Sequence, residues 1–206
     1  MAMKYQFTEN WFVNHLPIWR DLFRKYLPER ILEVGSFEGR SASYISEECA
    51  SLRQLVCIDT WEDYPGMQRE FAGVQMSRVE KRFDDNMAVA CRRRPTPIDF
   101  RKIKDTSAHA LAMLVAERQT FDLVYIDGSH MASDVLTDAV FAFQLLRLGG
   151  VMILDDYLWR DKDTDGRDIL YAPKAAIDAF TNIFYKKISV MPCGIPDQIY
   201  LEKTAA

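Results

Sequence analysis

The chain has 206 residues, a net charge of −4 and 49% hydrophobic residues. This length and composition favour a single soluble domain with a substantial core. The negative net charge counts against a general attraction to nucleic acid or to an anionic membrane. No apolar run reaches membrane-spanning length, and residues 4–10 are too polar for a signal peptide, so we expect a cytoplasmic protein.

The four cysteines lack the close pairs that zinc sites usually show. They are Cys49, Cys57, Cys91 and Cys193. Cys57 lies in an apolar run and Cys49 near the end of a predicted helix, so we expect reduced, structural thiols.

Residues 1–29 precede the first predicted strand and form an N-terminal extension. Thr8–Leu27 is rich in aromatic residues at partly helical spacing, and Pro17 predicts a break into two short helices. We expect this extension to pack on the sheet as a helical layer or to cover the substrate side of a crevice. Its apolar residues would equally suit a homo-oligomer contact.

Residues 30–206 read as one α/β domain. Apolar runs predict strands at Ile31–Val34, Leu55–Ile58, Pro97–Ile103, Phe121–Ile126 and Val151–Leu154. Helices are predicted between them at Ser41–Ala50, Ser107–Glu117 and Ala132–Leu146, with Gly149 and Gly150 ending the last, and a helical stretch from Met67 lies within 61–94. This alternation predicts a doubly wound, mostly parallel sheet with right-handed connections.

The C-terminal part predicts two further strands. Pro173 opens a helix that runs over Lys174–Phe184. The strand-like runs Lys187–Met191 and Gln198–Leu201 follow, and the link between them is too short for a crossover helix. We therefore expect an antiparallel hairpin that completes a seven-stranded sheet.

A glycine-containing turn follows the first strand, in RILEVGSFEGRS at 30–41. Gly35 and Gly39 allow close backbone approach to a ligand, and the helix that follows presents unpaired N–H groups. The spacing is not the dinucleotide fingerprint G-x-G-x-x-G. Glu33 would repel a pyrophosphate and suits a cationic ligand. The alternative is an ordinary turn between a strand and a helix, in which the glutamate has no binding role.

Two further strand ends carry candidate ligand contacts. Asp59, at the tip of the second strand, is placed to bind the two hydroxyls of a ribose, or to cap a helix. Asp105 and Ser107 follow the third strand at the same edge and would contact an adenine or cap the next helix.

Three carboxylates follow the fourth and fifth strands. Asp127 ends the fourth, and Asp155 and Asp156 end the fifth. If these strands are neighbours, the uncompensated charges would crowd one small region, and a hard divalent cation such as Mg²⁺ would relieve the repulsion. Consecutive aspartates point in opposite directions in a strand, so both would bind one ion only across a bend. Helix caps are the alternative.

His130 stands three residues after Asp127, where a histidine is suited to act as a general base. His15 and His109 show no comparable surroundings in the sequence. A surface or capping histidine is the alternative for His130.

Five segments resemble class I S-adenosylmethionine (SAM) methyltransferases. Within that class they resemble the metal-dependent O-methyltransferases that act on macrolide sugars, such as the macrocin and mycinamicin O-methyltransferases. The more distant resemblance is to catechol-type O-methyltransferases. The segments are ILEVGSFEGRS (31–41), CIDTW (57–61), FDLVYIDGSHMASDVLTD (121–138), LRLGGVMILDDY (146–157) and APKAAIDAF (172–180).

The resemblance implies a role for each candidate residue. By position, the metal ligands are Asp127, Asp155 and Asp156, and the general base is His130 with Asp127 beside it. The SAM contacts are Glu33, Gly35, Ser36, Gly39, Ser41, Asp59, Thr60, Trp61, Asp105, Ser107 and Asp127. Residues 159–171 would form a cover.

We therefore expect a SAM-dependent methyltransferase that uses Mg²⁺ or another divalent cation to methylate a hydroxyl of a small molecule. Neither nucleic acid nor a membrane is an expected partner. The alternatives are a metal-independent methyltransferase that relies on His130 alone, a nicotinamide-dependent oxidoreductase, and a non-catalytic SAM-binding protein.

Overall fold

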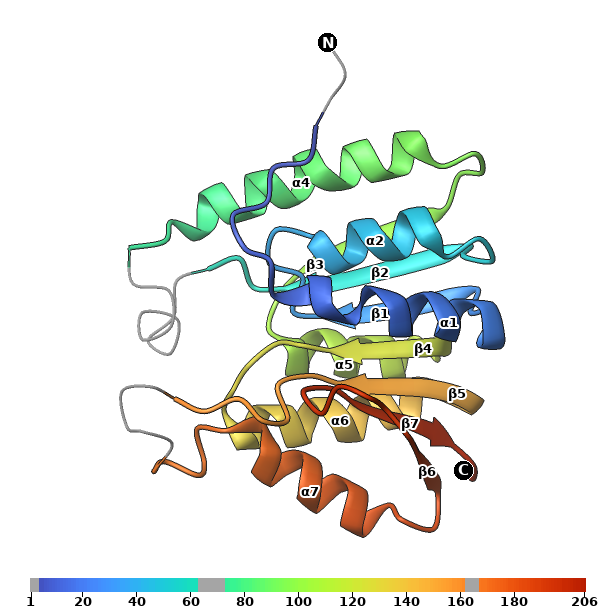
Figure 1. The fold of residues 1–206 in the computed structure, drawn as a ribbon, viewed down its shortest axis with the longest axis vertical. Helices are drawn as coiled ribbons and strands as arrows, with labels where there is room; N and C mark the ends of the chain where they lie inside the picture. The colour runs from blue at the N-terminus through green and yellow to red at the C-terminus, as the bar shows by residue number, and fades with distance from the viewer. Residues whose placement is uncertain (1–3, 63–72, 162–166) are drawn as a thin grey trace.

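The computed structural model describes residues 4–62, 73–161 and 167–206 (Figure 1). Its centre is a seven-stranded sheet in the order β3-β2-β1-β4-β5-β7-β6. Neighbours among β1–β5 pair in parallel, and β7 runs antiparallel to both β5 and β6. The strands are β1 Arg30–Val34, β2 Gln54–Asp59, β3 Asp99–Lys104, β4 Phe121–Ile126, β5 Leu146–Leu154, β6 Ile188–Met191 and β7 Ile199–Lys203. The predicted sheet and its C-terminal hairpin are confirmed.

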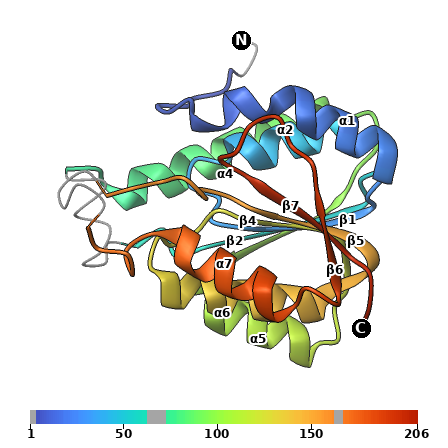
Figure 2. The ribbon, with the colours of Figure 1, turned by 60° about the horizontal axis from the view of Figure 1, so that its bottom comes forward.

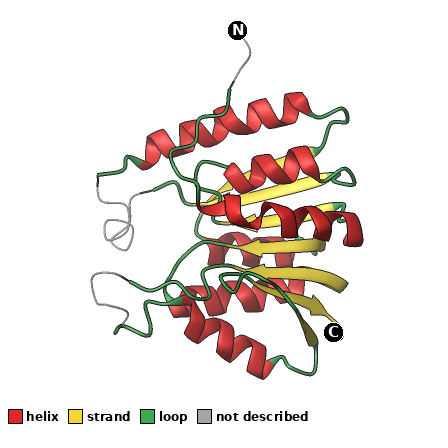
Figure 3. Ribbon diagram, viewed as in Figure 1, coloured by secondary structure: helices red, strands yellow, loops and turns green. Residues whose placement is uncertain are grey.

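Helices cover both faces of the sheet (Figures 2 and 3). They are η1 Trp11–His15, α1 Leu16–Tyr26, α2 Arg40–Glu48, α4 Met76–Arg93, α5 Ser107–Ala116, α6 Ala132–Leu145 and α7 Pro173–Ile183. Figure 2 shows α1, α2 and α4 on one face and α5, α6 and α7 on the other. Because side chains alternate along a strand, Ile31 of β1 joins one apolar core and Leu32 the other. Among the described residues, no helix combines the length and apolarity of a membrane span.

The fifth strand begins earlier than the sequence suggested. Gly149 and Gly150 lie inside β5 and do not separate it from α6. Gly149 has φ +73°, and the pairing with β4 shifts register between Phe121 and Leu123. A side chain on Gly150 would place its Cβ 3.0 Å from the Asp122 carbonyl oxygen. The glycines therefore form an irregularity within the strand, because glycine adopts positive φ without strain.

The N-terminal extension packs as a helical layer. Pro17 lies in the first turn of α1, which is where the break between two short helices was predicted. Trp19 and Phe23 are buried in the same apolar core as Ile31 and Tyr125. The part of the predicted stretch from Met67 to residue 72 lies outside the described residues, and α4 begins at Met76.

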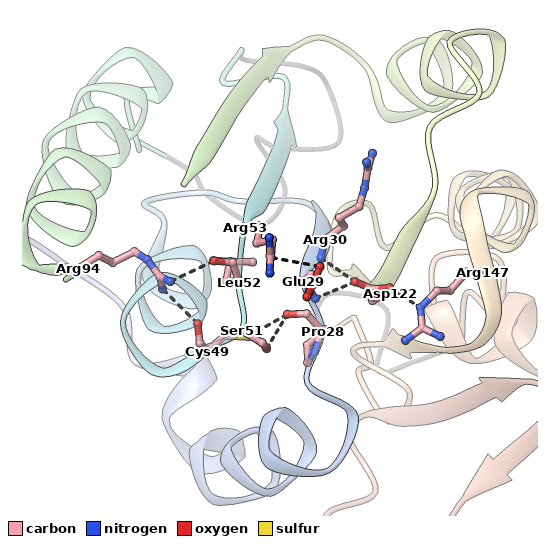
Figure 4. Close-up of polar contacts among 10 residues, drawn as sticks. All are labelled: Pro28, Glu29, Arg30, Cys49, Ser51, Leu52, Arg53, Arg94, Asp122 and Arg147. Atoms are coloured by element: carbon pink, nitrogen blue, oxygen red, sulfur yellow. Dashed lines mark hydrogen bonds and ion pairs between the residues drawn. The ribbon is translucent and has the colours of Figure 1, made fainter. Parts of the chain in front are cut away.

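The amino ends of the central strands are joined by polar contacts (Figure 4). Asp122 Oδ2 accepts hydrogen bonds from the backbone N–H groups of Glu29 at 2.7 Å and Arg30 at 2.8 Å, and Oδ1 pairs with the Arg147 guanidinium. Burial alone would raise the pKa of Asp122, but these donors together lower it. Arg94 donates to the carbonyl oxygens that end α2, including that of Cys49. This edge is thus charge-compensated.

Candidate functional site

The carboxyl ends of β1, β4 and β5 meet at the opposite edge of the sheet. Val34 pairs with Ile126, which pairs with Leu154, so the residues that follow emerge together. The Asp127 N–H donates to the Val34 carbonyl at 2.8 Å, and the Asp155 N–H donates to that of Ile126 at 3.0 Å. All three predicted aspartates line one hollow there. Its lining is Ile126, Asp127, Gly128, Ser129, Val135, Leu154, Asp155, Asp156 and Pro173. We call Asp127, Asp155 and Asp156 the aspartate cluster.

Tyr125 bridges two members of the aspartate cluster. Its hydroxyl lies 2.8 Å from Asp127 Oδ2 and also hydrogen-bonds Asp155 Oδ2. A phenol has one hydrogen, so it donates to only one of these carboxylates at a time. Burial and the repulsion of neighbouring carboxylates both raise the pKa values of Asp127 and Asp155. The two groups therefore form an under-compensated anionic pair.

Asp156 takes the bend that joint ligation requires. Its φ of +59° turns the chain sharply after Asp155. The Asp156 side chain reaches His130, with Oδ2 2.8 Å from Nε2, and the Trp159 ring lies over the imidazole at a centroid distance of 4.0 Å. Within the described ranges, no group of three His, Cys, Asp or Glu side chains is arranged to hold a metal ion. Asp156 is oriented towards the histidine in this arrangement.

Glu33 organises the loop between β1 and α2. The hydroxyls of Ser36 and Ser41 each donate to its carboxylate at 2.5 Å. Burial raises the pKa of Glu33 to about 7, although these two hydrogen bonds favour the charged form. The structure thus brings Glu33, Ser36 and Ser41 into one buried contact.

Both glycines of this loop have a packing role. Gly35 has φ +86°, and a Cβ there would lie 1.8 Å from the Asp127 carbonyl oxygen. Gly39 has φ +75°, and its Cβ would lie 2.9 Å from the Phe83 ring. Any larger residue at Gly35 would therefore separate the loop from the aspartate cluster.

The tip of β2 is tied to the same loop. Asp59 Oδ2 accepts from the backbone N–H groups of Ser36 at 3.0 Å and Phe37 at 2.9 Å, and Oδ1 accepts from that of Trp61 at 2.8 Å. The Trp61 indole N–H donates to the Phe37 carbonyl at 2.8 Å. Thr60 stands between Asp59 and Trp61 in the sequence. Asp59 thereby shapes the proposed SAM loop.

Asp105 lies just before α5 and contacts residues at the start of that helix. Its carboxylate accepts from the Thr106 N–H at 2.8 Å and lies 2.5 Å from His109 Nδ1. Ser107 is the first residue of α5. Nearby in space, Asp138 of α6 is almost completely buried, and burial raises its pKa to about 7 against the opposing influence of the Ser107 hydroxyl.

Three residues of this region were not singled out from the sequence. Tyr125 lies within an apolar strand, and Gln198 immediately precedes the second strand of the C-terminal hairpin, so neither belongs to a recognisable motif. His15 is buried, and the charges of Asp156 and Asp197 act on it, which corrects the view that its surroundings are uninformative. Burial nevertheless lowers the pKa of His15.

The part of the chain that forms this site matches a known protein family. A profile of the family described as "Methyltransferase domain" matches residues 32–157, which is more than half of the chain. The chain belongs to this methyltransferase family. The match includes the β1–α2 loop, Asp59, His130 and the whole aspartate cluster. A comparison with curated protein sequences gave no match.

Solved structures share the fold of this methyltransferase. A candidate O-methyltransferase from Klebsiella pneumoniae has 18% identity and a TM-score of 0.68, over 97% of this chain and 83% of that one. An O-methyltransferase from Bacillus cereus, in complex with SAH, has 14% identity and a TM-score of 0.62, over 98% and 84%. MycE of the mycinamycin pathway, in complex with Mg, SAH and mycinamycin VI, has 17% identity and a TM-score of 0.61, over 97% and 51%.

Proposed function

We propose that this methyltransferase transfers the methyl group of SAM to a hydroxyl of a small molecule, with a divalent cation held by the aspartate cluster. The observation that carries the proposal is the convergence of three carboxylates and His130 beside the β1–α2 loop. An acceptor hydroxyl placed in the hollow would lie next to an acidic cluster, a histidine and the proposed methyl donor.

The cofactor would lie along the β1–α2 loop and the tip of β2. Glu33 and Asp59 supply carboxylates there, and Gly35 keeps the loop close to Asp127. A sulfonium cation suits this acidic surrounding better than a pyrophosphate does. Asp59 would hold the ribose hydroxyls, and Asp105 with Ser107 would contact the adenine.

The donor set fits a hard cation. Asp127, Asp155 and Asp156 offer only carboxylate oxygens, which are the ligands that Mg²⁺ prefers. Burial, and after it the repulsion of neighbouring carboxylates, raises the pKa values of Asp127 and Asp155, and a bound cation would offset both effects. When bound, such an ion would lower the pKa of the acceptor hydroxyl and help to orient it.

His130 would take the proton of the acceptor hydroxyl. Its contact with Asp156 fixes the ring orientation, and the carboxylate stabilises the imidazolium that forms. The hydroxyl oxygen then forms a bond to the methyl carbon as the carbon–sulfur bond breaks, which leaves S-adenosylhomocysteine (SAH). Holding both reactants in line supplies much of the rate enhancement.

A metal-independent reaction is the second candidate, and one observation favours it. The Asp156–His130 contact of 2.8 Å orients the histidine without any cation. Membership of the methyltransferase family decides against a nicotinamide-dependent oxidoreductase. The acceptor is proposed to be a small hydroxylated compound, in line with the mycinamycin VI bound in the MycE structure.

The test joins cofactor binding to metal dependence. Calorimetry should show binding of SAH and none of NAD. Methyl transfer to a panel of hydroxylated natural products should stop on addition of EDTA and return with excess Mg²⁺. Binding of SAH with EDTA-resistant turnover would support the metal-independent candidate, and a failure to bind SAH would contradict both.

A further inference from the structure

Gln198 connects the N-terminal extension to the aspartate cluster. The indole N–H of Trp19 in α1 donates to Gln198 Oε1 at 3.0 Å, and the Tyr200 hydroxyl bonds the same oxygen at 2.5 Å. The Gln198 amide nitrogen donates to Asp155 Oδ2 at 2.7 Å. Trp19 and Gln198 are both 0% exposed, so these hydrogen bonds are shielded from water. They form a buried path from α1 to a proposed metal ligand.

The partners of Gln198 determine which way its amide faces. An indole N–H can only donate, so the atom opposite Trp19 must be the carbonyl oxygen. The NH₂ group is then directed at Asp155, which accepts hydrogen bonds when ionised. Tyr200 can donate or accept and would tolerate either orientation. Trp19 and Asp155 therefore select the same orientation from opposite ends.

Asp155 is held at both of its oxygens. Oδ2 receives Gln198 Nε2 and contacts the Tyr125 hydroxyl, and Oδ1 accepts from the Asp156 N–H at 2.8 Å. Of these partners, Tyr125 lies in β4 and Asp156 is the residue next to Asp155, whereas Gln198 comes from a distant segment and immediately precedes β7. Without it, Oδ2 would keep only the Tyr125 hydroxyl, whose single hydrogen is shared with Asp127, and the carboxylate could turn about its bond to the Asp156 N–H.

We infer that Gln198 is a positioning residue, which holds the Asp155 carboxylate in the orientation that faces the hollow, and that Trp19 makes the N-terminal extension part of this support. That this orientation helps to bind a cation rests on the function proposed above. The orientation itself does not depend on a cation.

A purely structural glutamine would fill the same space and stabilise the fold, but it would leave Asp155 unchanged when replaced. The two roles therefore differ in what happens to one carboxylate. Gln198→Met preserves the length of the side chain and removes its donor and acceptor. Tyr200→Phe is the matched control, since it removes one bond to Oε1 and leaves both Trp19 and the donation to Asp155 in place.

The experiment compares metal-free crystal structures of the full-length wild type and of the variants Gln198→Met, Trp19→Phe and Tyr200→Phe. It also compares their Mn²⁺ titrations, which are monitored by electron paramagnetic resonance. In Gln198→Met the Asp155 carboxylate should rotate or become split, and the dissociation constant for Mn²⁺ should rise at least about tenfold. Trp19→Phe should give a smaller shift in the same direction. Tyr200→Phe should leave the carboxylate in place and the constant within about twofold. Calorimetric SAH affinity should be unchanged in all three.

An unchanged Asp155 in Gln198→Met, or an equal change in Tyr200→Phe, would overturn the inference. If Gln198→Met does not fold, Gln198→Asn replaces it, because the shorter amide stays polar but withdraws its donor from Asp155. Absence of Mn²⁺ binding by the wild type would contradict the metal part of the proposed function. The metal-free crystal structures would still decide the role of Gln198.

Discussion

One strand carries an aspartate near each of its ends, and the two have opposite electrostatic settings. Asp122, near the start of β4, receives two backbone N–H groups and a guanidinium, and its pKa is lowered. Asp127, directly after β4, faces two other carboxylates and a single phenol hydrogen, and its pKa is raised. The amino edge of the sheet is organised for stability, whereas the carboxyl edge retains repulsion that a ligand could relieve.

The largest effect is expected at the carboxyl edge. Asp155→Asn keeps the shape of the side chain and removes one charge from the aspartate cluster. Methyl transfer should fall about 1000-fold, as when a charge-stabilising group is lost. The free energy of unfolding should change little, because the relief of carboxylate repulsion offsets the loss of one hydrogen bond accepted by the side chain. Turnover assays and chemical denaturation check this. A large loss of stability with full activity would reverse the comparison.

The next effect concerns His130. His130→Asn removes the proposed base but retains a polar side chain beside Asp156. The turnover number should fall about 100-fold, and the rise of the rate with pH that we expect for the wild type should be absent from the variant. A pH–rate profile of both proteins measures this, and SAH affinity is the control. An unchanged profile would assign the proton transfer to another group.

A pH-dependent effect is expected from Asp138, the buried carboxylate on α6. Its pKa of about 7 lies above the usual aspartate value of 3.8, so the folded protein binds more protons than the unfolded chain between these pH values. Wild-type stability should therefore fall as pH rises through this window. Asp138→Asn should remove that loss and gain about 2 kcal/mol more at pH 8 than at pH 5. Denaturation at both pH values tests this, with Asp21→Asn, whose side chain is exposed on α1, as control.

The smallest effect is expected at the amino edge. Asp122→Asn weakens contacts to Arg147 and to two backbone N–H groups. The free energy of unfolding should fall by about 1 kcal/mol, and methyl transfer below the unfolding transition should be unaffected. The comparison with Asp155→Asn is the most informative one. The same Asp→Asn change should affect mainly stability at the amino edge and mainly activity at the carboxyl edge. Equal losses of activity in Asp122→Asn and Asp155→Asn would contradict the functional difference between the two edges.

The sequence predicts the parts of this molecule that depend on local pattern. Short apolar runs ending in glycine or aspartate mark the strands, and parallel pairing brings Asp127 and Asp155 to the same edge, as it does in the structure. The start of β5 was missed because Gly149 and Gly150 usually end elements, whereas here they lie within a strand. Local pattern cannot reveal that difference.

The support around the site depends on contacts between distant segments. Trp19 and Gln198 are 179 residues apart in the chain, and their hydrogen bond exists only because α1 packs against the sheet beside β7. Tyr125 reads as an ordinary strand residue until its hydroxyl is seen between Asp127 and Asp155. The electrostatic influence of Asp156 on His15 likewise depends on where η1 packs. Periodicity and motif spacing carry no information on such contacts.

The most direct test of the comparison is anomalous diffraction from crystals of the wild-type protein grown with SAH and Mn²⁺. The account predicts one anomalous peak at the carboxyl edge, in contact with the carboxylates of Asp127, Asp155 and Asp156, and none beside Asp122. A map with SAH bound along the β1–α2 loop and no peak at the aspartate cluster, at saturating Mn²⁺, would contradict it.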